Sequence, residues 1–177
     1  MGLREVFVSS ADFFKRERMD FAVIGAFSLR AFGYTRATRD IDLITRTEHQ
    51  EKIIAYLTSL GFETIQRTTA FTNHIHPVEN TRIDIMYVEG VTADKIFTAV
   101  WKGLIIEELE FPVVSPEHLI ALKLFAASND PKRKFREFAD IQQILQRVKT
   151  DKKAVREYFR KYGFEGDYEE IIQDDCR

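Results

Sequence analysis

The chain has 177 residues, of which 45% are hydrophobic and 31% are charged. This length suits one domain, or one domain with a small helical appendage, and it suffices for a hydrophobic core without disulfides or a structural metal. The formal net charge of -2 excludes a global basic field that would recruit nucleic acid and leaves room only for a local basic patch. The single cysteine, Cys176, cannot form an internal disulfide, so we expect a reducing compartment.

The chain carries no evident targeting signal. Its first residues lack the apolar core of a signal peptide, and no apolar run approaches the roughly 20 residues that span a bilayer. No internal repeat or low-complexity segment is present. We therefore expect a soluble, cytoplasmic protein that does not contact a membrane.

The first two thirds of the chain alternate between helical and extended patterns. The expected helices cover residues 3–18, 26–32, 47–60 and 92–102. The expected strands cover residues 21–24, 39–46, 62–67, 70–76 and 81–88, with one or two more within 104–114. Short polar turns separate the three strands between 62 and 88, which predicts antiparallel neighbours. Phe97, Trp101 and Phe111 are expected in the core.

The character of the chain changes at Pro116. Ser115 is a suitable helix N-cap, and Pro116 suits the first helical position. The pattern then stays helical, with expected helices over 116–128, 132–148 and 152–162. We predict an α+β fold: a mixed, largely antiparallel sheet flanked by helices, with a helical C-terminal third. The expected division is 1–115 for the α/β core and 116–177 for a helical part packed on the same core.

The most informative segment is Asp40-Ile41-Asp42. In a strand, side chains alternate between faces, so both carboxylates point to the same side. Two adjacent carboxylates repel each other unless a cation lies between them, and magnesium is the usual hard cation for oxygen ligands. Taken alone, Asp-x-Asp more often marks a solvated acidic edge strand. Asp84 strengthens the metal interpretation, because it lies within an apolar strand where an unpaired carboxylate would be costly.

If the strand of Asp84 lies beside that of Asp40 and Asp42, three carboxylates converge and can hold two metal ions about 4 Å apart. The alternative for Asp84 is a salt bridge to Arg82 or Arg39. Gly25 ends a buried strand and opens a helix, which presents backbone N–H groups to a phosphate. Ser28 in the first turn is a further hydrogen-bond partner for a phosphate oxygen, although a glycine at such a junction often only makes the turn.

Together these residues resemble a known signature. The stretches Val23-Ile24-Gly25-Ala26-Phe27-Ser28 and Arg36-Ala37-Thr38-Arg39-Asp40-Ile41-Asp42 look like those of the DNA polymerase beta superfamily of nucleotidyltransferases, and in particular of the small AbiEii-type toxins. The stretches 119–126 and 138–145 resemble the C-terminal half of the same group, so that the likeness covers about residues 21–145.

The resemblance implies roles for individual residues. It implies that Asp40, Asp42 and Asp84 are catalytic and bind Mg²⁺ or Mn²⁺, and that Lys123 and Asp140 are also needed for catalysis. It implies that the nucleotide is bound by Gly25, Ala26, Ser28, Arg39 and Lys123. Ala26 departs from the family pattern, which often has Gly or Ser there, so its backbone N–H remains while a hydroxyl is lost. On residues alone, Lys123 would reach the surface from an apolar helix, and Asp140 would pair with Gln143 or Arg136.

Two further groups have open interpretations. The basic run Lys132, Arg133, Lys134 and Arg136 is either a contact for nucleic acid or triphosphate, or a solvated helix face. His74 and His76 share one strand face without an apparent third ligand, so we interpret them as surface or lining residues rather than a metal site.

The resemblance implies an enzyme that moves a nucleoside monophosphate from an NTP to an acceptor hydroxyl on a tRNA 3′ end or a protein side chain. It also implies a possible toxin role with a cognate antitoxin. The alternatives are a binding protein that keeps the fold without turnover, and a nucleotidyltransferase for small molecules such as antibiotics.

Overall fold

The structure, a computed structural model, describes residues 2–38, 40–106 and 108–174. Contacts within the chain divide it into two compact units. Unit 1 comprises residues 1–31 and 35–114, and unit 2 comprises residues 32–34 and 115–177. None of the helices in the described ranges combines the length and hydropathy needed to cross a lipid bilayer.

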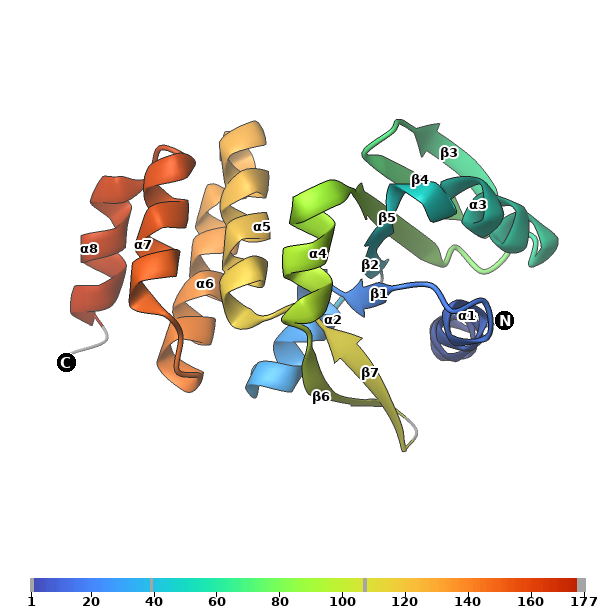
Figure 1. Cartoon of the computed structure of the whole chain (residues 1–177), viewed down its shortest axis with the longest axis horizontal. Helices are drawn as coiled ribbons and strands as arrows, with labels where there is room; N and C mark the ends of the chain where they lie inside the picture. The colour runs from blue at the N-terminus through green and yellow to red at the C-terminus, as the bar shows by residue number, and fades with distance from the viewer. Residues whose placement is uncertain (1, 39, 107, 175–177) are drawn as a thin grey trace. The chain divides into compact units, whose positions relative to one another are not determined.

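Unit 1 is built on a mixed sheet whose described strands follow the order β3-β4-β5-β2-β1-β7-β6 (Figure 1). The strands are β1 (Phe21–Val23), β2 (Asp40–Arg46), β3 (Glu63–Arg67), β4 (Phe71–Ile75), β5 (Arg82–Val88), β6 (Trp101–Ile106) and β7 (Leu109–Val113). The β2–β5 and β1–β7 pairs are parallel, and the other pairs are antiparallel. The predicted α+β fold with a mixed, largely antiparallel sheet is thus confirmed.

The helices of unit 1 lie close to their predicted positions. They are α1 (Leu3–Arg16), α2 (Gly25–Ser28), α3 (Gln50–Ser59) and α4 (Gly90–Thr98). Thr47 was expected to cap α3, but a 3-10 turn over Thr47–His49 precedes that helix and Thr47 is not its N-cap. Helix α4 ends before the predicted limit of 102, because Trp101 already pairs with Val113 in the sheet.

Alternation along β2 and β5 separates a dry face from a polar one. Ile41, Leu43 and Thr45 are buried on one face of β2, and β5 contributes three buried residues, Ile83, Ile85 and Tyr87. Burying each large aliphatic side chain stabilises the fold by about 1.5–3 kcal/mol. The charged residues of the two strands therefore lie on the opposite face.

Aromatic residues fill much of the remaining core of unit 1. Phe13 of α1 stacks on Tyr56 of α3 with ring centroids 3.8 Å apart. Phe111 is fully buried and meets Phe7 edge to face, as its predicted core position requires. Trp101 was also expected in the core, but it is 36% exposed on β6, an edge strand that has a sheet neighbour on one side only.

Unit 2 is helical, as predicted for the C-terminal third (Figure 1). Its helices are α5 (Pro116–Asn129), α6 (Lys134–Arg147), α7 (Lys152–Lys161) and α8 (Glu165–Asp174), with a 3-10 turn over Pro131–Arg133 before α6. The Ser115 hydroxyl caps α5 by accepting a hydrogen bond from the His118 amide at 3.2 Å. Helix α8 lies beyond the last predicted helix, and Tyr168 packs it edge to face on Phe159 of α7.

Candidate active site

The centre of the polar face is a pair of aspartates from two neighbouring strands. Strands β2 and β5 pair in parallel with Asp42 opposite Asp84 and Asp40 opposite Arg82. Residues opposite each other in a sheet share a face, and alternation adds Asp40 to that face. The condition that the sequence left open, namely that the strand of Asp84 lies beside the strand of Asp40 and Asp42, is met.

Gly25 lies directly against the Asp42 carboxylate. The Ile24 amide donates to the Asp42 carbonyl at 2.9 Å, which ties the end of β1 to β2. Gly25 has φ +64°, and a Cβ built on it would lie 2.5 Å from Cγ of Asp42, within the volume of the carboxylate. Only glycine fits here, because any side chain would displace Asp42 and would also be strained at this φ. Gly25 is the first residue of α2, and the backbone N–H group of Ala26 comes next in the chain.

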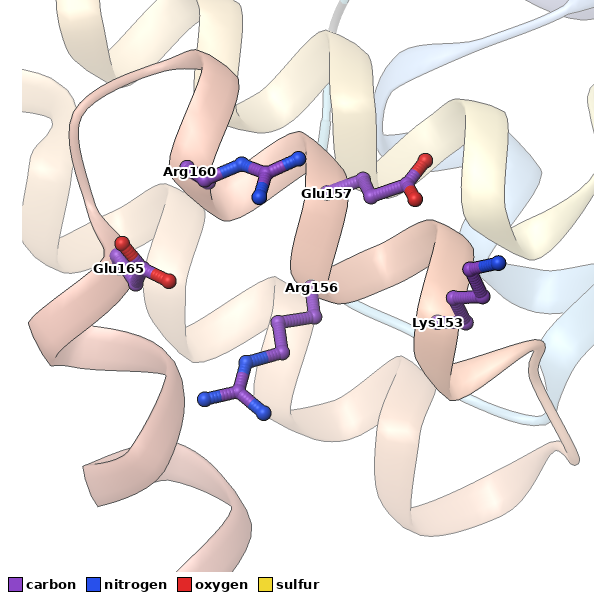
Figure 2. Close-up of a pocket in the computed structure, with 5 residues that line it drawn as sticks. All are labelled: Lys153, Arg156, Glu157, Arg160 and Glu165. Carbon is purple, nitrogen blue, oxygen red and sulfur yellow. The ribbon is translucent and has the colours of Figure 1, made fainter.

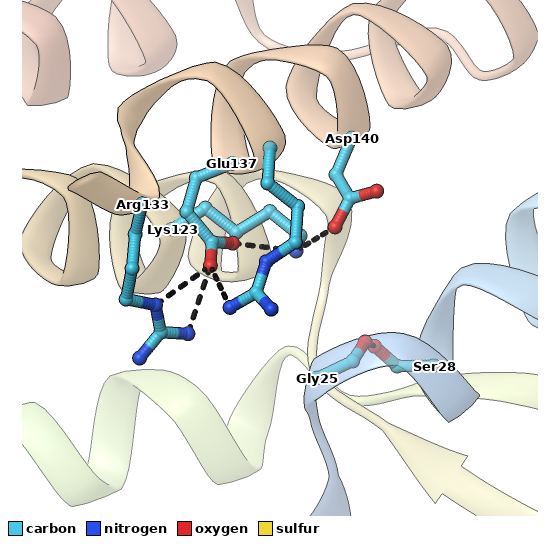
Figure 3. A network of polar contacts seen from close by, with 7 residues as sticks. Gly25, Ser28, Lys123, Arg133, Glu137 and Asp140 are labelled. Carbon is cyan, nitrogen blue, oxygen red and sulfur yellow. Dashed lines mark hydrogen bonds and ion pairs between the residues drawn. The ribbon is translucent and has the colours of Figure 1, made fainter. Parts of the chain in front are cut away.

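Ser28 holds the turn that brings Gly25 to this position. It is fully buried, and its hydroxyl donates a 2.8 Å hydrogen bond to the Gly25 carbonyl (Figure 3). The hydroxyl proton is therefore used within the short helix α2. A contact from Ser28 to phosphate stays a prediction.

Asn73 is a residue of this face that the sequence did not reveal. It lies opposite Asp84 on β4, and its side-chain amide donates to Oδ1 of Asp84 at 2.7 Å. A row of three side chains, Asn73, Asp84 and Asp42, thus crosses β4, β5 and β2. The signal for Asn73 is its position in the register of the sheet, which only the pairing of the strands reveals.

The donor set of this face suits a hard divalent cation. Carboxylate oxygens are the ligands that magnesium prefers, and magnesium is usually held by one or two carboxylates together with waters and substrate phosphates. The described residues contain no group of three or more His, Cys, Asp or Glu side chains that could hold a metal ion. The carboxylates of Asp42 and Asp84, on one face of the sheet, are oxygen ligands of the kind that magnesium binds together with a substrate phosphate.

Asp40 and Arg39 are the remaining predicted site residues of unit 1. Asp40 is partly exposed at the start of β2, where its amide meets the Thr38 hydroxyl at 3.4 Å. Arg39, predicted to bind nucleotide, lies outside the described residues. The assignments of Asp40, Asp42 and Asp84 as metal ligands remain predictions.

His74 lies on the opposite face of β4 from Asn73. It is 1% exposed, its Nε2 is 2.8 Å from the Thr72 hydroxyl, and its Nδ1 is 3.1 Å from the Thr64 hydroxyl. The interpretation of His74 as a surface or lining residue is therefore wrong. Burial lowers the pKa of His74 from 6.5 to about 4, so the ring is neutral near pH 7.

Unit 2 holds a buried ionic network centred on Lys123 (Figure 3). The ammonium group donates to Oε2 of Glu137 at 3.0 Å and to Oδ2 of Asp140 at 2.5 Å. Lys123 is 4% exposed, so it does not reach the surface as the residues alone suggested. Its ion pair with Asp140 joins α5 to α6. The network brings together the two predicted residues of this unit.

Glu137 is the member of the network that the sequence did not reveal. Its Oε1 accepts from Nε and Nη2 of Arg133 at 3.1 and 2.8 Å and from Nη2 of Arg136 at 3.1 Å. Burial acts to raise the pKa of Glu137, but Lys123 and Arg133 outweigh burial and hold that pKa at about 2. Glu137 is thus an anion at any physiological pH. Arg133 and Arg136 are near Glu137 in the sequence, but Lys123 lies on another helix, and no short motif indicates that pairing.

A separate pocket of about 300 Å³ lies on unit 2 between α7 and α8 (Figure 2). It is lined by Lys153, Arg156, Glu157, Arg160 and Glu165. The labelled side chains do not converge on one point, and Arg156 is bound to Glu169 at 2.8 Å. The pocket contains none of the predicted site residues.

Several solved structures have the same fold as this chain. The antibiotic-resistance factor ANT(2'')-Ia superimposes with a TM-score of 0.69 at 14% identity, covering 97% of this chain and 94% of that one. The lincomycin-bound lincosamide antibiotic adenylyltransferase LnuA gives a TM-score of 0.56 at 16% identity over 77% of this chain and 92% of its own. An antigenic nucleotidyltransferase-like protein from Paracoccidioides brasiliensis gives a TM-score of 0.60 at 14% identity, covering 97% of this chain and 92% of that one. The fold is that of the nucleotidyltransferases.

The family follows from the sequence itself. Residues 11–175 match the model of the nucleotidyl transferase AbiEii toxin family of type IV toxin–antitoxin systems. The chain therefore belongs to this family of nucleotidyltransferases, as the resemblance of its motifs predicted. No curated protein matches the chain with significance.

Proposed function

We propose that the protein is a magnesium-dependent enzyme that transfers a nucleoside monophosphate from an NTP to an acceptor hydroxyl. The observation that carries the proposal is the packing of the Asp42 carboxylate against the bare backbone of Gly25, with Asp84 in register beside it. This arrangement places the oxygen ligands of Asp42 against a turn whose residue 25 has no side chain of its own. Phosphate approach to the backbone needs such a turn.

In the proposed reaction, the acceptor oxygen forms a bond to the α-phosphorus and the bond to the bridging oxygen breaks, so that pyrophosphate leaves. Bound magnesium would supply charge stabilisation for the phosphates and the leaving group. Asp42 and Asp84, with Asp40, are proposed to hold the metal. Asp84 is also proposed to take the hydroxyl proton, and Asn73 donates a hydrogen bond that fixes its carboxylate. The backbone at Gly25 and Ala26 is proposed to contact the triphosphate.

The acceptor is proposed to be a tRNA 3′ end or a protein side chain. Membership of a toxin family supports a role in a toxin–antitoxin pair and therefore a cognate antitoxin. A small-molecule acceptor is the second candidate, and the likeness of the fold to an antibiotic adenylyltransferase favours it.

The test is a labelling reaction with each of four α-labelled NTPs, magnesium and total tRNA. Wild-type protein should transfer label to RNA, or to protein, and Asp42→Ala should lose the transfer while keeping its circular dichroism spectrum and melting temperature. Label on RNA identifies a tRNA-directed enzyme, and label on protein identifies a protein-directed one. Full transfer by Asp42→Ala would contradict the proposed metal site.

Two further assays separate the alternatives. If no label moves but calorimetry shows magnesium-dependent nucleotide binding, either the acceptor was not supplied or the protein is a binding protein that keeps the fold. Resistance of expressing cells to an antibiotic, with label on the drug, would instead identify a small-molecule enzyme.

A further inference from the structure

We propose that Arg133 and Arg136 form a phosphate-binding site in unit 2 whose shape is set by the buried carboxylate of Glu137. The proposal rests on the proposed function for its ligand class, since an NTP and a nucleic-acid acceptor both bring phosphate. It assigns to the two arginines the contact that the resemblance implies for Lys123.

The geometry of the site comes from one oxygen atom. Oε1 of Glu137 accepts hydrogen bonds from both guanidinium groups, which fixes them side by side. Arg133 engages this oxygen through two nitrogens, Nε and Nη2. A guanidinium held in this way has already lost much of its side-chain freedom, so binding an anion costs less entropy.

The charges in the cluster do not balance. Among the ion pairs of the described residues, three cations, Lys123, Arg133 and Arg136, contact two carboxylates, Glu137 and Asp140, which is one positive charge more than the negative charges. Both arginines donate to one oxygen of the buried Glu137 carboxylate, so the two guanidinium groups lie close together and repel each other. A phosphate on the outer side would relieve that repulsion.

Exposure separates the cations that can meet a ligand from the one that cannot. The side chain of Lys123 is 5% exposed and its ammonium contacts both carboxylates. The side chains of Arg133 and Arg136 are 45% and 54% exposed. Each guanidinium has five N–H donors, and the bonds to Glu137 use two from Arg133 and one from Arg136. Lys123 therefore acts as a positioning cation, and the two arginines present the donors that match phosphate.

The phosphate has two sources, a nucleotide triphosphate or a nucleic-acid backbone. Phe135 lies between the two arginines in the sequence and is 88% exposed. An exposed aromatic ring among cations is a platform on which a base can stack, so Phe135 provides a means to distinguish the sources.

The experiment measures binding rather than turnover, so its outcome is independent of the transfer assay. Calorimetry in EDTA would measure the affinity of the full chain for inorganic tripolyphosphate, and fluorescence anisotropy would measure that for a single-stranded RNA oligonucleotide. The double variant Arg133→Gln/Arg136→Gln should weaken at least one of these by about tenfold or more. Lys132→Gln is the matched control, because Lys132 is an exposed neighbour whose backbone amide, which the substitution keeps, donates a hydrogen bond to Asp130.

A lysine variant separates loss of binding from loss of folding, and Phe135→Ala distinguishes the two sources of phosphate. Arg133→Lys/Arg136→Lys retains the charge against Glu137, so it should fold even if the glutamine pair does not, and it should still lose affinity because the fork is lost. If the arginine variants lose affinity for tripolyphosphate alone, and Phe135→Ala has no effect, the nucleotide is the source of the phosphate. If they lose affinity for RNA alone, and Phe135→Ala also binds RNA more weakly, a nucleic acid is the source of the phosphate.

Three results would overturn the proposal. The first is wild-type protein that binds neither probe. The second is an equal loss in Lys132→Gln, which would show a diffuse charge effect. The third is unchanged affinity for both probes in the folded arginine variants.

Discussion

Asp42 and Asp84 lie opposite each other on β2 and β5, two adjacent parallel strands, and their side chains share the polar face of the sheet. Each carboxylate also has its own support, the bare backbone of Gly25 for Asp42 and the amide of Asn73 for Asp84. The two supports come from different parts of unit 1, so they can be removed separately.

Gly25→Ala should abolish transfer and destabilise unit 1. The new Cβ would overlap the Asp42 carboxylate, and a non-glycine residue in the left-handed region costs a further 1–2 kcal/mol, roughly. Gly90→Ala is the matched control, because Gly90 has φ +55° with no atom within 4 Å of an added Cβ. Transfer rates and urea unfolding of both variants would show whether the loss at position 25 exceeds the backbone cost alone.

Asn73→Ala should lower kcat about 10- to 100-fold with little change in melting temperature, because a partner that orients a metal-binding carboxylate typically has an effect of this size. The magnesium concentration for half-maximal rate should rise as well, since the Asp84 carboxylate loses its fixed orientation. Asn73→Asp should be worse, because a second carboxylate would face Asp84. An unchanged magnesium requirement in Asn73→Ala would argue against this positioning role.

Lys123→Met should destabilise the protein by about 3–5 kcal/mol, because it removes the buried cation that Glu137 and Asp140 share. Lys52→Met is the control, since Lys52 forms an exposed pair with Glu17 and such pairs contribute about 0–1 kcal/mol. Chemical denaturation of both variants would measure the difference. Adding Asp140→Asn to Lys123→Met should recover part of the loss, and no recovery would indicate that the lost contact is not electrostatic.

Stability should fall as the pH drops below about 6.5. The folded-state pKa of His74 is lowered to about 4, so its contribution is fully present above 6.5 and is lost between 6.5 and 4. The loss amounts to about 3 kcal/mol at most. Glu137, with its pKa lowered to about 2, adds a second loss from 4.5 downwards. The free energy of unfolding measured from pH 8 to 4 should flatten in His74→Gln, and an unchanged slope would contradict the assignment to His74.

Local patterns in the sequence predicted much of unit 1. Alternation around Ile41 placed Asp40 and Asp42 on one face, and the strands around Asp84 were confirmed as neighbours in a mixed sheet. The roles of these aspartates are still predictions. The pattern also predicted the start of α5, because an N-cap serine followed by proline is a local signal.

What the sequence did not reveal depends on contacts between distant residues. Nothing in the local sequence distinguishes Asn73 or Glu137 from other polar residues. The strand register brings Asn73 to Asp84, and the packing of α5 against α6 brings Glu137 to Lys123. Trp101 was placed in the core because of its size, but an edge strand leaves it partly exposed. Helix α8 was missed because glycines at 163 and 166 interrupt the pattern at its start.

Strand β4 couples the site to the core through its register. Asn73 and His74 are adjacent, so one contacts Asp84 on the polar face while the other is buried on the opposite face. A slip of one residue would exchange their faces, placing an imidazole beside Asp84 and a primary amide in the buried face. The burial of His74 and Thr72 therefore fixes the register of β4, and with it the position of Asn73 opposite Asp84. Substitutions in the interior of unit 1 can then reduce activity without touching the polar face.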